Sequence, residues 1–277
     1  MIKSLMFSCG AFKGIMFIGS IKLLLEKKKF KYEELELLGG ISIGSMFAFL
    51  YIIGYSIEEI EEFIINFEFI KITNNYDLLD IIDSFGFEDG DKLEYVLKAL
   101  LKNKFNIEDI TFLELYEKVN KILLIQAVNL NTTSLETFTH ETHPSLSVIT
   151  AIKMTSCVPI IFKPILYNSN YYIDGGIIST IPRLTKEYLV SKNINYNEII
   201  YFCIENNCIN TEIESLGDYI FNVIKCIFNK SDIVPIESYT ITLISNCDSI
   251  IPESHEKEDL IKLGYEQTLL QYDLIQD

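Results

Sequence analysis

The serine at position 42 stands in a setting that can turn a hydroxyl into a nucleophile. Glycines lie two positions away on both sides of it, in the segment Gly40-Ile41-Ser42-Ile43-Gly44. An apolar run from Leu35 to Leu38 precedes this segment, and an uncharged stretch from Met46 to Ile53 follows it. This order predicts a strand, a sharp turn and a buried helix, which is the order of a nucleophile elbow for acyl transfer. An ordinary strand-to-helix turn made of small residues is the alternative.

A second loop of small residues, Ser8-Cys9-Gly10-Ala11-Phe12-Lys13-Gly14, lies near the N-terminus between an apolar run and a helical pattern. Backbone N–H groups that open a helix can bind an anion. The loop matches neither GxxxxGK[ST] nor GxGxxG, so it does not indicate a nucleotide phosphate. The anion we expect is the oxyanion of a tetrahedral intermediate. A plain tight turn is again the alternative.

An aspartate at the end of a further apolar strand could supply a base. The run Tyr171-Tyr172-Ile173 leads directly into Asp174-Gly175-Gly176. Asp-Gly is also among the commonest turn signals, so a simple hairpin would explain the same residues. In the functional interpretation, the carboxylate at the strand end lies beside the Ser42 hydroxyl.

These segments, together with Cys157-Val158-Pro159-Ile160-Ile161-Phe162-Lys163-Pro164, resemble the patatin-like phospholipase family. Members of that family carry a glycine-rich oxyanion loop near the N-terminus, a GxSxG elbow a few tens of residues later and a DGG or DGA aspartate much further on. The same pieces occur here in the same order, at Cys9 to Gly14, Gly40 to Gly44 and Asp174 to Gly176. The resemblance covers about residues 3–182.

The resemblance implies a Ser-Asp dyad, with Ser42 as the nucleophile and Asp174 as the general base. It implies that the oxyanion hole consists of the backbone amides of Gly10, Ala11 and Phe12. The residues that would support these loops are Lys13, Gly14, Gly40, Gly44, Gly175 and Gly176. No cofactor and no metal are implied.

The histidines do not change this expectation, since the family uses none in its dyad. His140 and His143 are three residues apart, which would suit two metal ligands on one helical face. Threonine, proline and serine around them indicate a loop instead, and no third ligand is evident nearby.

The chain departs from the family in the oxyanion loop, where Cys9 and Ala11 take the places of the first and third glycines. If position 11 requires a positive φ, alanine there costs of the order of 1 kcal/mol and could misplace a donor. Loss of one oxyanion donor lowers a rate by about 10² to 10³. The departure could therefore weaken activity without abolishing it.

The resemblance implies a serine esterase: a lipid acyl hydrolase of the phospholipase A or lysophospholipase type that works through an acyl-enzyme intermediate. Its substrate would be a phospholipid or another fatty-acyl ester, with peripheral membrane contact as an option. Two alternatives stay open. The same dyad could hydrolyse small esters or thioesters, or the protein could be a catalytically silent lipid binder of the same fold.

Charge limits the choice of partners. The formal net charge of −16 opposes nucleic-acid binding, which needs a basic surface. Four lysines nevertheless gather at the end of the first predicted helix, at positions 27, 28, 29 and 31. Cations suit a helix C-terminus, so a solvated helix end is the first interpretation and a patch for phospholipid headgroups is the second.

The sequence predicts a cytoplasmic protein that could also be peripheral to membranes. The uncharged stretch from Leu37 to Ile57 is long enough to span a bilayer, but its four glycines favour a buried strand, turn and helix. No signal peptide is expected, because Met1-Ile2-Lys3 leads straight into the first strand. The six cysteines show no CxxC pair, which is typical of free thiols in a reducing compartment.

The alternation of strands and helices predicts an α/β fold, a three-layer α/β/α sandwich with a mainly parallel central sheet, as one domain over residues 1–277. Strands are expected at Ile122–Asn129, Glu198–Ile204 and Tyr239–Ser245, in addition to those beside the motifs. Helices are expected from Ser56 and from Thr111, each beginning with a capping box that a glutamate three residues later completes, and over Asp91–Leu101, Val148–Ser156 and Glu256–Tyr272. The segment from Glu58 to Leu115 could form a lid over a substrate.

Overall fold

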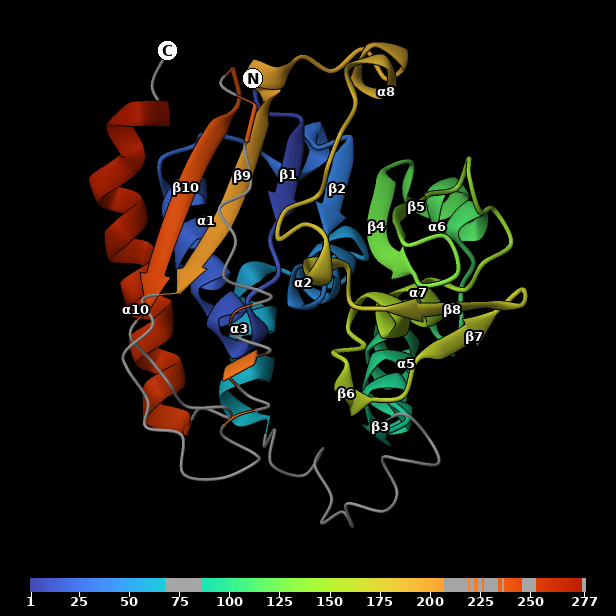
Figure 1. Cartoon of the computed structure of the whole chain (residues 1–277). Coiled ribbons are helices and arrows are strands. Elements are labelled where there is room, and N and C mark those ends of the chain that lie inside the picture. The colour runs from blue at the N-terminus through green and yellow to red at the C-terminus, as the bar shows by residue number, and fades with distance from the viewer. Residues whose placement is uncertain are drawn as a thin grey trace.

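A mixed sheet of eight strands forms the middle of the molecule (Figure 1). The computed structural model describes residues 1–67, 86–206, 237–245, 253–275 and a few single positions between 219 and 235, and the sheet is built from these. Its strand order is β10-β9-β1-β2-β4-β8-β7, and β5 also pairs with β4. The strands are β1 (Ser4–Phe7), β2 (Leu37–Gly40), β4 (Ile122–Asn129), β5 (Ser134–Phe138), β7 (Ile165–Tyr167), β8 (Asn170–Ile173), β9 (Ile199–Asn206) and β10 (Tyr239–Ser245).

The sheet is parallel from β10 through β9, β1 and β2 to β4, and antiparallel where β5, β7 and β8 join it. Parallel neighbours need crossover connections, which the helices supply. The prediction of a mainly parallel sheet is confirmed. As a result the carboxyl ends of β1, β2, β9 and β10 meet at one edge, the lower edge in Figure 1.

Helices cover both faces of the sheet, which confirms the predicted three layers. They are α1 (Met16–Glu26), α2 (Ile43–Ile52), α3 (Ile57–Asn66), α5 (Asp91–Phe105), α6 (Phe112–Val119), α7 (Val148–Thr155), α8 (Lys186–Ser191) and α10 (Ser254–Gln271). Most of them share the larger hydrophobic core with one face of the sheet. A smaller core, which includes Leu189 of α8, covers the other face, and Tyr116 of α6 packs against it.

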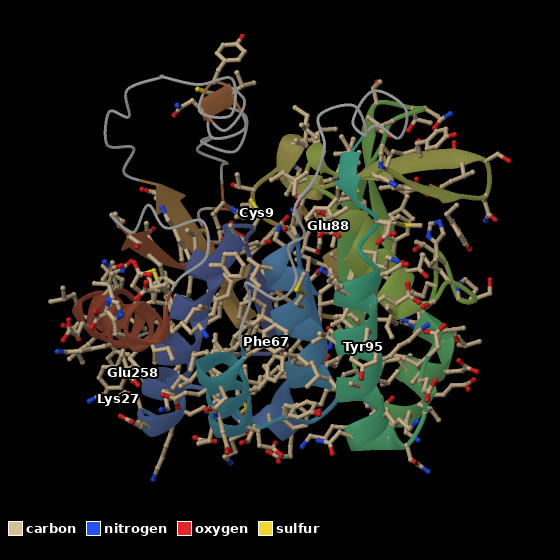
Figure 2. All side chains as sticks on the ribbon, turned by 90° about the horizontal axis from the view of Figure 1, so that it is seen from below. Cys9, Lys27, Phe67, Glu88, Tyr95 and Glu258 are labelled. Carbon is tan, nitrogen blue, oxygen red and sulfur yellow. The ribbon has the colours of Figure 1, made fainter. Side chains whose placement is uncertain are left out.

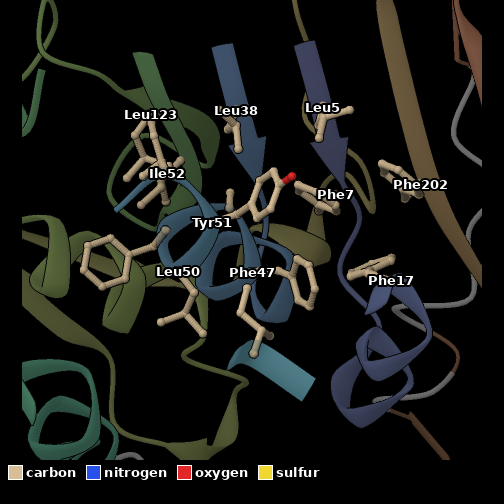
Figure 3. Packing of buried hydrophobic residues seen from close by; sticks show 14 of the residues in the cluster. Leu5, Phe7, Phe17, Leu38, Phe47, Leu50, Tyr51, Ile52, Leu123 and Phe202 are labelled. Carbon is tan, nitrogen blue, oxygen red and sulfur yellow. The ribbon is translucent and has the colours of Figure 1, made fainter. Parts of the chain in front are cut away.

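Four phenylalanine rings pack directly behind the end of β1 (Figure 3). The ring of Phe7 lies 5.3 Å from that of Phe17, 5.4 Å from that of Phe47 and 5.0 Å from that of Phe202, measured between centroids. Burying each such side chain contributes about 1.5–3 kcal/mol, and aromatic pairs add about 0.5–1.5 kcal/mol. This cluster fixes α1 and α2 against the end of β1.

Helix starts follow their sequence signals. Ser56 Oγ accepts a hydrogen bond from Glu59 N at 3.2 Å, and the Glu59 carboxylate accepts one from Ser56 N at 2.7 Å. Thr111 and Glu114 form the same reciprocal pair at the start of α6. Both predicted capping boxes are confirmed.

Helices α1 and α10 touch backbone to backbone. A Cβ on Gly19 would lie 1.9 Å from Ile261 O, and one on Gly264 would lie 2.0 Å from Met16 O. Ser20 Oγ donates a hydrogen bond to Gly264 O at 3.3 Å across the same crossing. Only glycine fits at these two positions, so the pair locks the C-terminal helix onto the N-terminal one.

Several short strands were not expected from the sequence. They are β3 (Gly86–Glu88), which pairs with β6 (Ile160–Phe162), and the strands β5 and β7. Strands of three to five residues are too short to show a clear alternation. The region expected to form a lid contains α3, β3, α5 and α6, while residues 68–85 within it lie outside the described part of the chain.

The lysine cluster lies at the edge of the sheet opposite to the strand ends. Because α1 connects two parallel strands, it runs back along the sheet, and it ends at Glu26 just before Lys27. Lys27 and Lys29 lie over the rings of Tyr272 and Tyr239. Among the helices described, none combines the length and the apolar character needed to cross a bilayer.

Two glutamines of α10 cover the outer edge of β10, which is the last strand of the sheet among the described residues. Gln271 Oε1 accepts a hydrogen bond from Thr242 N at 2.9 Å, and its Nε2 donates one to Thr242 O at 2.7 Å. Gln267 makes the same two bonds with Ile244 N and O, both at 2.8 Å. The i, i+4 spacing on the helix thus matches alternate residues of the strand, and the two amides replace a neighbouring strand.

Replacing Gln267 and Gln271 together by alanine should expose this edge. We expect the free energy of unfolding to fall by about 0.5–1.5 kcal/mol for each lost bond, and the protein to associate as its concentration rises. Urea unfolding and light scattering over a range of concentrations measure both effects. The matched control removes the exposed i, i+4 pair Lys262 and Glu266 from the same helix. A double variant as monomeric and stable as this control would contradict the interpretation.

Candidate active site

Ser42 occupies a strained turn between β2 and α2. Its backbone has φ 53° and ψ −126°, and the helix begins at the next residue. A positive φ is uncommon outside glycine and has to be stabilised by the surrounding structure. The side chain is only 8% exposed. The predicted strand, sharp turn and helix are therefore present, and the conformation is that of a nucleophile elbow.

The flanking glycines are needed because the turn has no room for side chains. A Cβ on Gly40 would lie 2.2 Å from the carbonyl carbon of Gly44, and a Cβ on Gly44 would lie 2.4 Å from Phe7 O. The first contact closes the turn on itself. The second brings the start of α2 against the end of β1.

Thr155 at the end of α7 supports the strained backbone. Ser42 N donates a hydrogen bond to Thr155 Oγ1 at 3.0 Å, and Thr155 Oγ1 donates one to Gln126 O at 2.6 Å. Thr155 is fully buried, so the bonds are shielded from water. Ser45 Oγ in turn donates to Ser42 O at 2.6 Å. The elbow is thus tied to α7, to β4 and to its own helix.

Asp174 follows β8 and is fully buried. Its N–H donates to Cys157 O at 2.9 Å, and its Oδ1 accepts a hydrogen bond from Gly176 N at 2.8 Å. A Cβ on Gly175 would lie 2.4 Å from Gln126 O, so only glycine lets the loop pass β4 this closely. The two glycines after the aspartate therefore fix the direction of its carboxyl group.

Burial raises the pKa of Asp174 to about 7, against a downward influence of the Gly176 N–H and of the Ser42 hydroxyl. The Ser42 hydroxyl is close enough to lower the pKa of the carboxyl group, but it does not form a hydrogen bond with Asp174 Oδ2. That oxygen is buried and has no hydrogen-bond partner among the described residues. Such bonds are often loose before substrate binds. The structure thus brings Ser42 and Asp174 together and leaves one carboxylate oxygen available.

The small-residue loop lies next to the elbow. A Cβ on Gly14 would lie 2.7 Å from Ile43 Cγ1, one residue beyond Ser42. The loop forms a 3₁₀ turn, Ala11–Ile15, which leads into α1. The N–H groups of Gly10 and Ala11 donate no hydrogen bond to any described residue. Figure 2 looks onto this edge of the molecule, with Cys9 near the middle of the view.

Position 11 does require a positive φ, since Ala11 has φ 48°. Alanine therefore occupies a position that requires a positive φ, and this conformation costs of the order of 1 kcal/mol relative to glycine. Lys13 Nζ donates to Ser245 O at 3.5 Å, at the end of β10, so the lysine helps to anchor the loop. Cys9 at the start of the loop is buried, with 4% of the residue exposed.

Gln126 is a site-supporting residue that the motifs did not reveal. Its Nε2 donates to Arg183 O and its Oε1 accepts from Arg183 N, both at 2.8 Å. These bonds fasten the loop after Asp174, while the Gln126 carbonyl receives the Thr155 hydroxyl. The one signal in the sequence is a single polar side chain inside the otherwise apolar run Ile122–Val128.

The two neighbouring histidines have structural partners. His140 stacks on Tyr116 at 3.8 Å between centroids, and His143 Nε2 lies 3.1 Å from Glu136 Oε1. Within the described part of the chain, no three His, Cys, Asp or Glu side chains are grouped to hold a metal ion. The thiols of Cys157 and Cys226 are free, and positions 208 and 247 lie outside the described residues.

Removing the Thr155 hydroxyl should disturb the elbow. Thr155→Val keeps the shape but leaves Ser42 N without its acceptor, which should cost about 1–3 kcal/mol of stability. A displacement of the hydroxyl by about 1 Å can lower a rate by about 10². Thr155→Ser should restore both properties. Urea unfolding and hydrolysis of a short-chain ester test this, and a valine variant with unchanged turnover would refute the supporting role.

The raised pKa of Asp174 also predicts a pH-dependent stability. A carboxyl whose pKa rises from 3.8 to about 7 on folding stabilises the protein fully below pH 3.8, and this contribution is lost as the pH rises through 7. Asp174→Asn should therefore gain stability relative to the wild type between pH 4 and pH 8, by up to about 4 kcal/mol. Urea unfolding at several pH values measures the gap. A gap independent of pH would show that the carboxyl is not buried as described.

Comparison with known proteins identifies the family of this chain and several relatives. The family model for patatin-like phospholipase matches residues 5–185. "Probable lipid hydrolase 463L" of Invertebrate iridescent virus 6 is 34% identical over 183 residues, which are 65% of this chain and 61% of that protein. "Uncharacterized protein R571" of Acanthamoeba polyphaga mimivirus is 29% identical over 177 residues, or 63% of this chain and 58% of that protein. The chain thus matches about three fifths of the length of these relatives.

Solved structures share the fold over nearly the whole chain. VipD from Legionella pneumophila superposes with a TM-score of 0.64 at 17% identity, covering 98% of this chain and 67% of that one. ExoU from Pseudomonas aeruginosa, in complex with SpcU, gives a TM-score of 0.57 at 14% identity and covers 99% of this chain and 52% of that one. Because the family model matches residues 5–185, which are more than half of the chain, the chain belongs to the patatin-like phospholipase family.

Proposed function

We propose that this protein is a lipid acyl hydrolase that cleaves fatty-acyl esters of phospholipid or lysophospholipid with a Ser42–Asp174 dyad. The observation that carries the proposal is the geometry of the pair. A serine on a strained elbow lies beside a fully buried carboxyl whose pKa is about 7 and whose Oδ2 has no partner among the described residues. Family membership and the name of the iridescent virus relative support the same class of substrate.

The carboxylate can serve as the base because burial has made it a stronger one. An exposed aspartate is a poor acceptor for a hydroxyl proton, since its pKa is near 3.9. At a pKa of about 7, a large fraction of Asp174 is ionised at neutral pH, and the group retains a useful affinity for the proton. Ser42 Oγ then attacks the ester carbonyl as its proton passes to Asp174 Oδ2.

The loop at positions 10–12 is suited to the charge that develops. The attack converts the carbonyl oxygen into an oxyanion, which needs donors already in place. The N–H groups of Gly10 and Ala11 donate to no described residue, which suits that role, and Phe12 supplies the third amide of the proposed hole. The proton returns to the leaving alcohol, and water removes the acyl group from Ser42 by the same route.

One observation favours the alternative of a silent lipid binder. Ala11 adopts a positive φ that alanine tolerates poorly. The Ala11 N–H, a donor of the proposed oxyanion hole, therefore depends on a conformation that the rest of the loop must maintain. The anchor from Lys13 to Ser245 O and the contact of Gly14 with Ile43 work against that strain. We therefore place the hydrolase first.

The test is hydrolysis of a short-chain p-nitrophenyl ester and of a labelled phospholipid by wild type, Ser42→Ala and Asp174→Asn. We expect turnover to fall about 10³-fold or more in both variants, because each removes a member of one chemical unit. Ser191→Ala and Asp259→Asn change exposed residues of the same types and should retain full turnover. A chelator should leave turnover intact, since the proposed steps use no metal.

The ratio of the two substrates decides between lipid and small ester. Turnover that persists in folded Ser42→Ala would refute the dyad. A folded wild type that hydrolyses neither substrate would favour the silent binder. Circular dichroism of every variant establishes that each is folded.

A further inference from the structure

Three apolar side chains form an exposed row across neighbouring strands at one end of the sheet. Leu166 of β7 is 60% exposed, Tyr171 of β8 is 44% exposed and Leu130, just after β4, is 41% exposed. Leu166 pairs with Tyr171 in register, and Leu130 N donates a hydrogen bond to Tyr171 O at 2.8 Å. Since alternate residues of a strand face opposite sides, the three side chains share one face. We call them the hairpin patch.

The opposite face of the same hairpin is already used by the core. Ile165 and Tyr172 are partners in register, Tyr172 is buried in the larger core, and Ile165 packs against it. Folding therefore accounts for one side of the hairpin only. The hairpin patch is left in contact with solvent, where exposed apolar residues in contact with one another often mark a binding surface.

Charge is nearly absent from the segments of chain that carry the hairpin patch. Charged residues make up 22% of the chain and give it a net charge of −16. Residues 154–173 nevertheless contain a single charged side chain, the cation Lys163, and residues 122–135 contain none. Carboxylates are costly to bring against a lipid layer, whereas a lysine can keep its ammonium group at the phosphate level. The two segments that carry the hairpin patch are thus depleted of the one type of charge that the rest of the chain has in excess.

The hairpin patch lies on strands that lead directly to the proposed dyad. Figure 1 shows β6, β7 and β8 in the lower right part of the molecule, below the level at which β1 and β2 end. Strand β8 ends immediately before Asp174. Lys163 and Ile165 line a small hollow together with Asp89, Lys153 and Cys157, and the carbonyl oxygen of Cys157 accepts the Asp174 N–H.

We propose that the hairpin patch is the surface by which the protein docks onto a lipid layer, with Leu130, Leu166 and Tyr171 entering its polar–apolar boundary. This inference rests on the proposed function, because it names how the same site reaches a lipid. Burial of apolar area contributes about 25 cal/mol per Å², and tyrosine suits an interface where one end is apolar and the other wet. The lysines at positions 27–31 lie at the opposite edge of the sheet. Docking through these lysines would point Ser42 away from the lipid layer.

Flotation with vesicles of zwitterionic phosphatidylcholine tests the docking without any catalysis. The protein carries Ser42→Ala throughout, so that the vesicles stay intact. The hairpin variant combines Leu166→Ser and Tyr171→Ser, and the control combines Val190→Ser and Leu270→Ser, which change exposed apolar residues on α8 and α10. We expect the hairpin variant to bind at least about tenfold more weakly, because two apolar side chains that would enter the layer are lost. The control should bind like its parent.

Activity of the same variants with Ser42 intact separates docking from chemistry. The hairpin variant should hydrolyse vesicle phospholipid about tenfold more slowly and a soluble p-nitrophenyl ester at the wild-type rate. A further result would be vesicle binding that depends on the hairpin patch, together with no ester turnover by the wild type. It would contradict the proposed function and still support the docking surface.

Three results would overturn the inference. One is equal vesicle binding by the hairpin variant and its parent. Another is an equal loss in the control, which would mean that any exposed apolar residue contributes. The third is a wild type that binds no vesicles and instead forms a dimer that the hairpin variant cannot form, as size-exclusion chromatography with light scattering would reveal.

Discussion

Burial of one carboxyl group is the constraint on which the rest of the site depends. Asp174 is fully buried, and removing its charge from water raises its pKa to about 7. The energetic cost of an ionised carboxylate there is limited by the Gly176 N–H, and the Ser42 hydroxyl lowers the pKa further. An aspartate in water could not serve as the base that we propose. The neighbouring loops are arranged to hold this group in place.

The support for the elbow comes from parts of the chain that are far apart in sequence. Thr155 of α7 and Gln126 of β4 connect the Ser42 amide to the loop that carries Asp174. Contacts that only glycine allows then bring β1, β2 and α2 together, as at Gly40 and Gly44. Strain at Ser42 is thereby stabilised by packing that the elbow itself does not supply. The antiparallel strand β8 ends just before Asp174 and so places this residue next to the parallel part of the sheet.

Local signals in the sequence predicted much of this fold. The bounds of β4 and β10 agree with the prediction, and both capping boxes form, because each depends on residues close in the chain. Thr155 and Gln126 could not be predicted in the same way, because their partners lie up to 113 residues away. The glutamines that cover β10 look like ordinary surface residues in sequence. The φ of Ala11 is likewise fixed by packing and could only be stated as a condition.

The central claim is that a buried aspartate with a raised pKa activates Ser42. The most direct measurement is the rate at which a fluorophosphonate labels Ser42, followed by mass spectrometry of the intact protein from pH 5 to pH 9. We predict that the rate in the wild type rises with a midpoint near pH 7, as Asp174 loses its proton. Asp174→Asn should label far more slowly, without that midpoint. Equal pH profiles in the two proteins, or a label on another residue, would contradict the account.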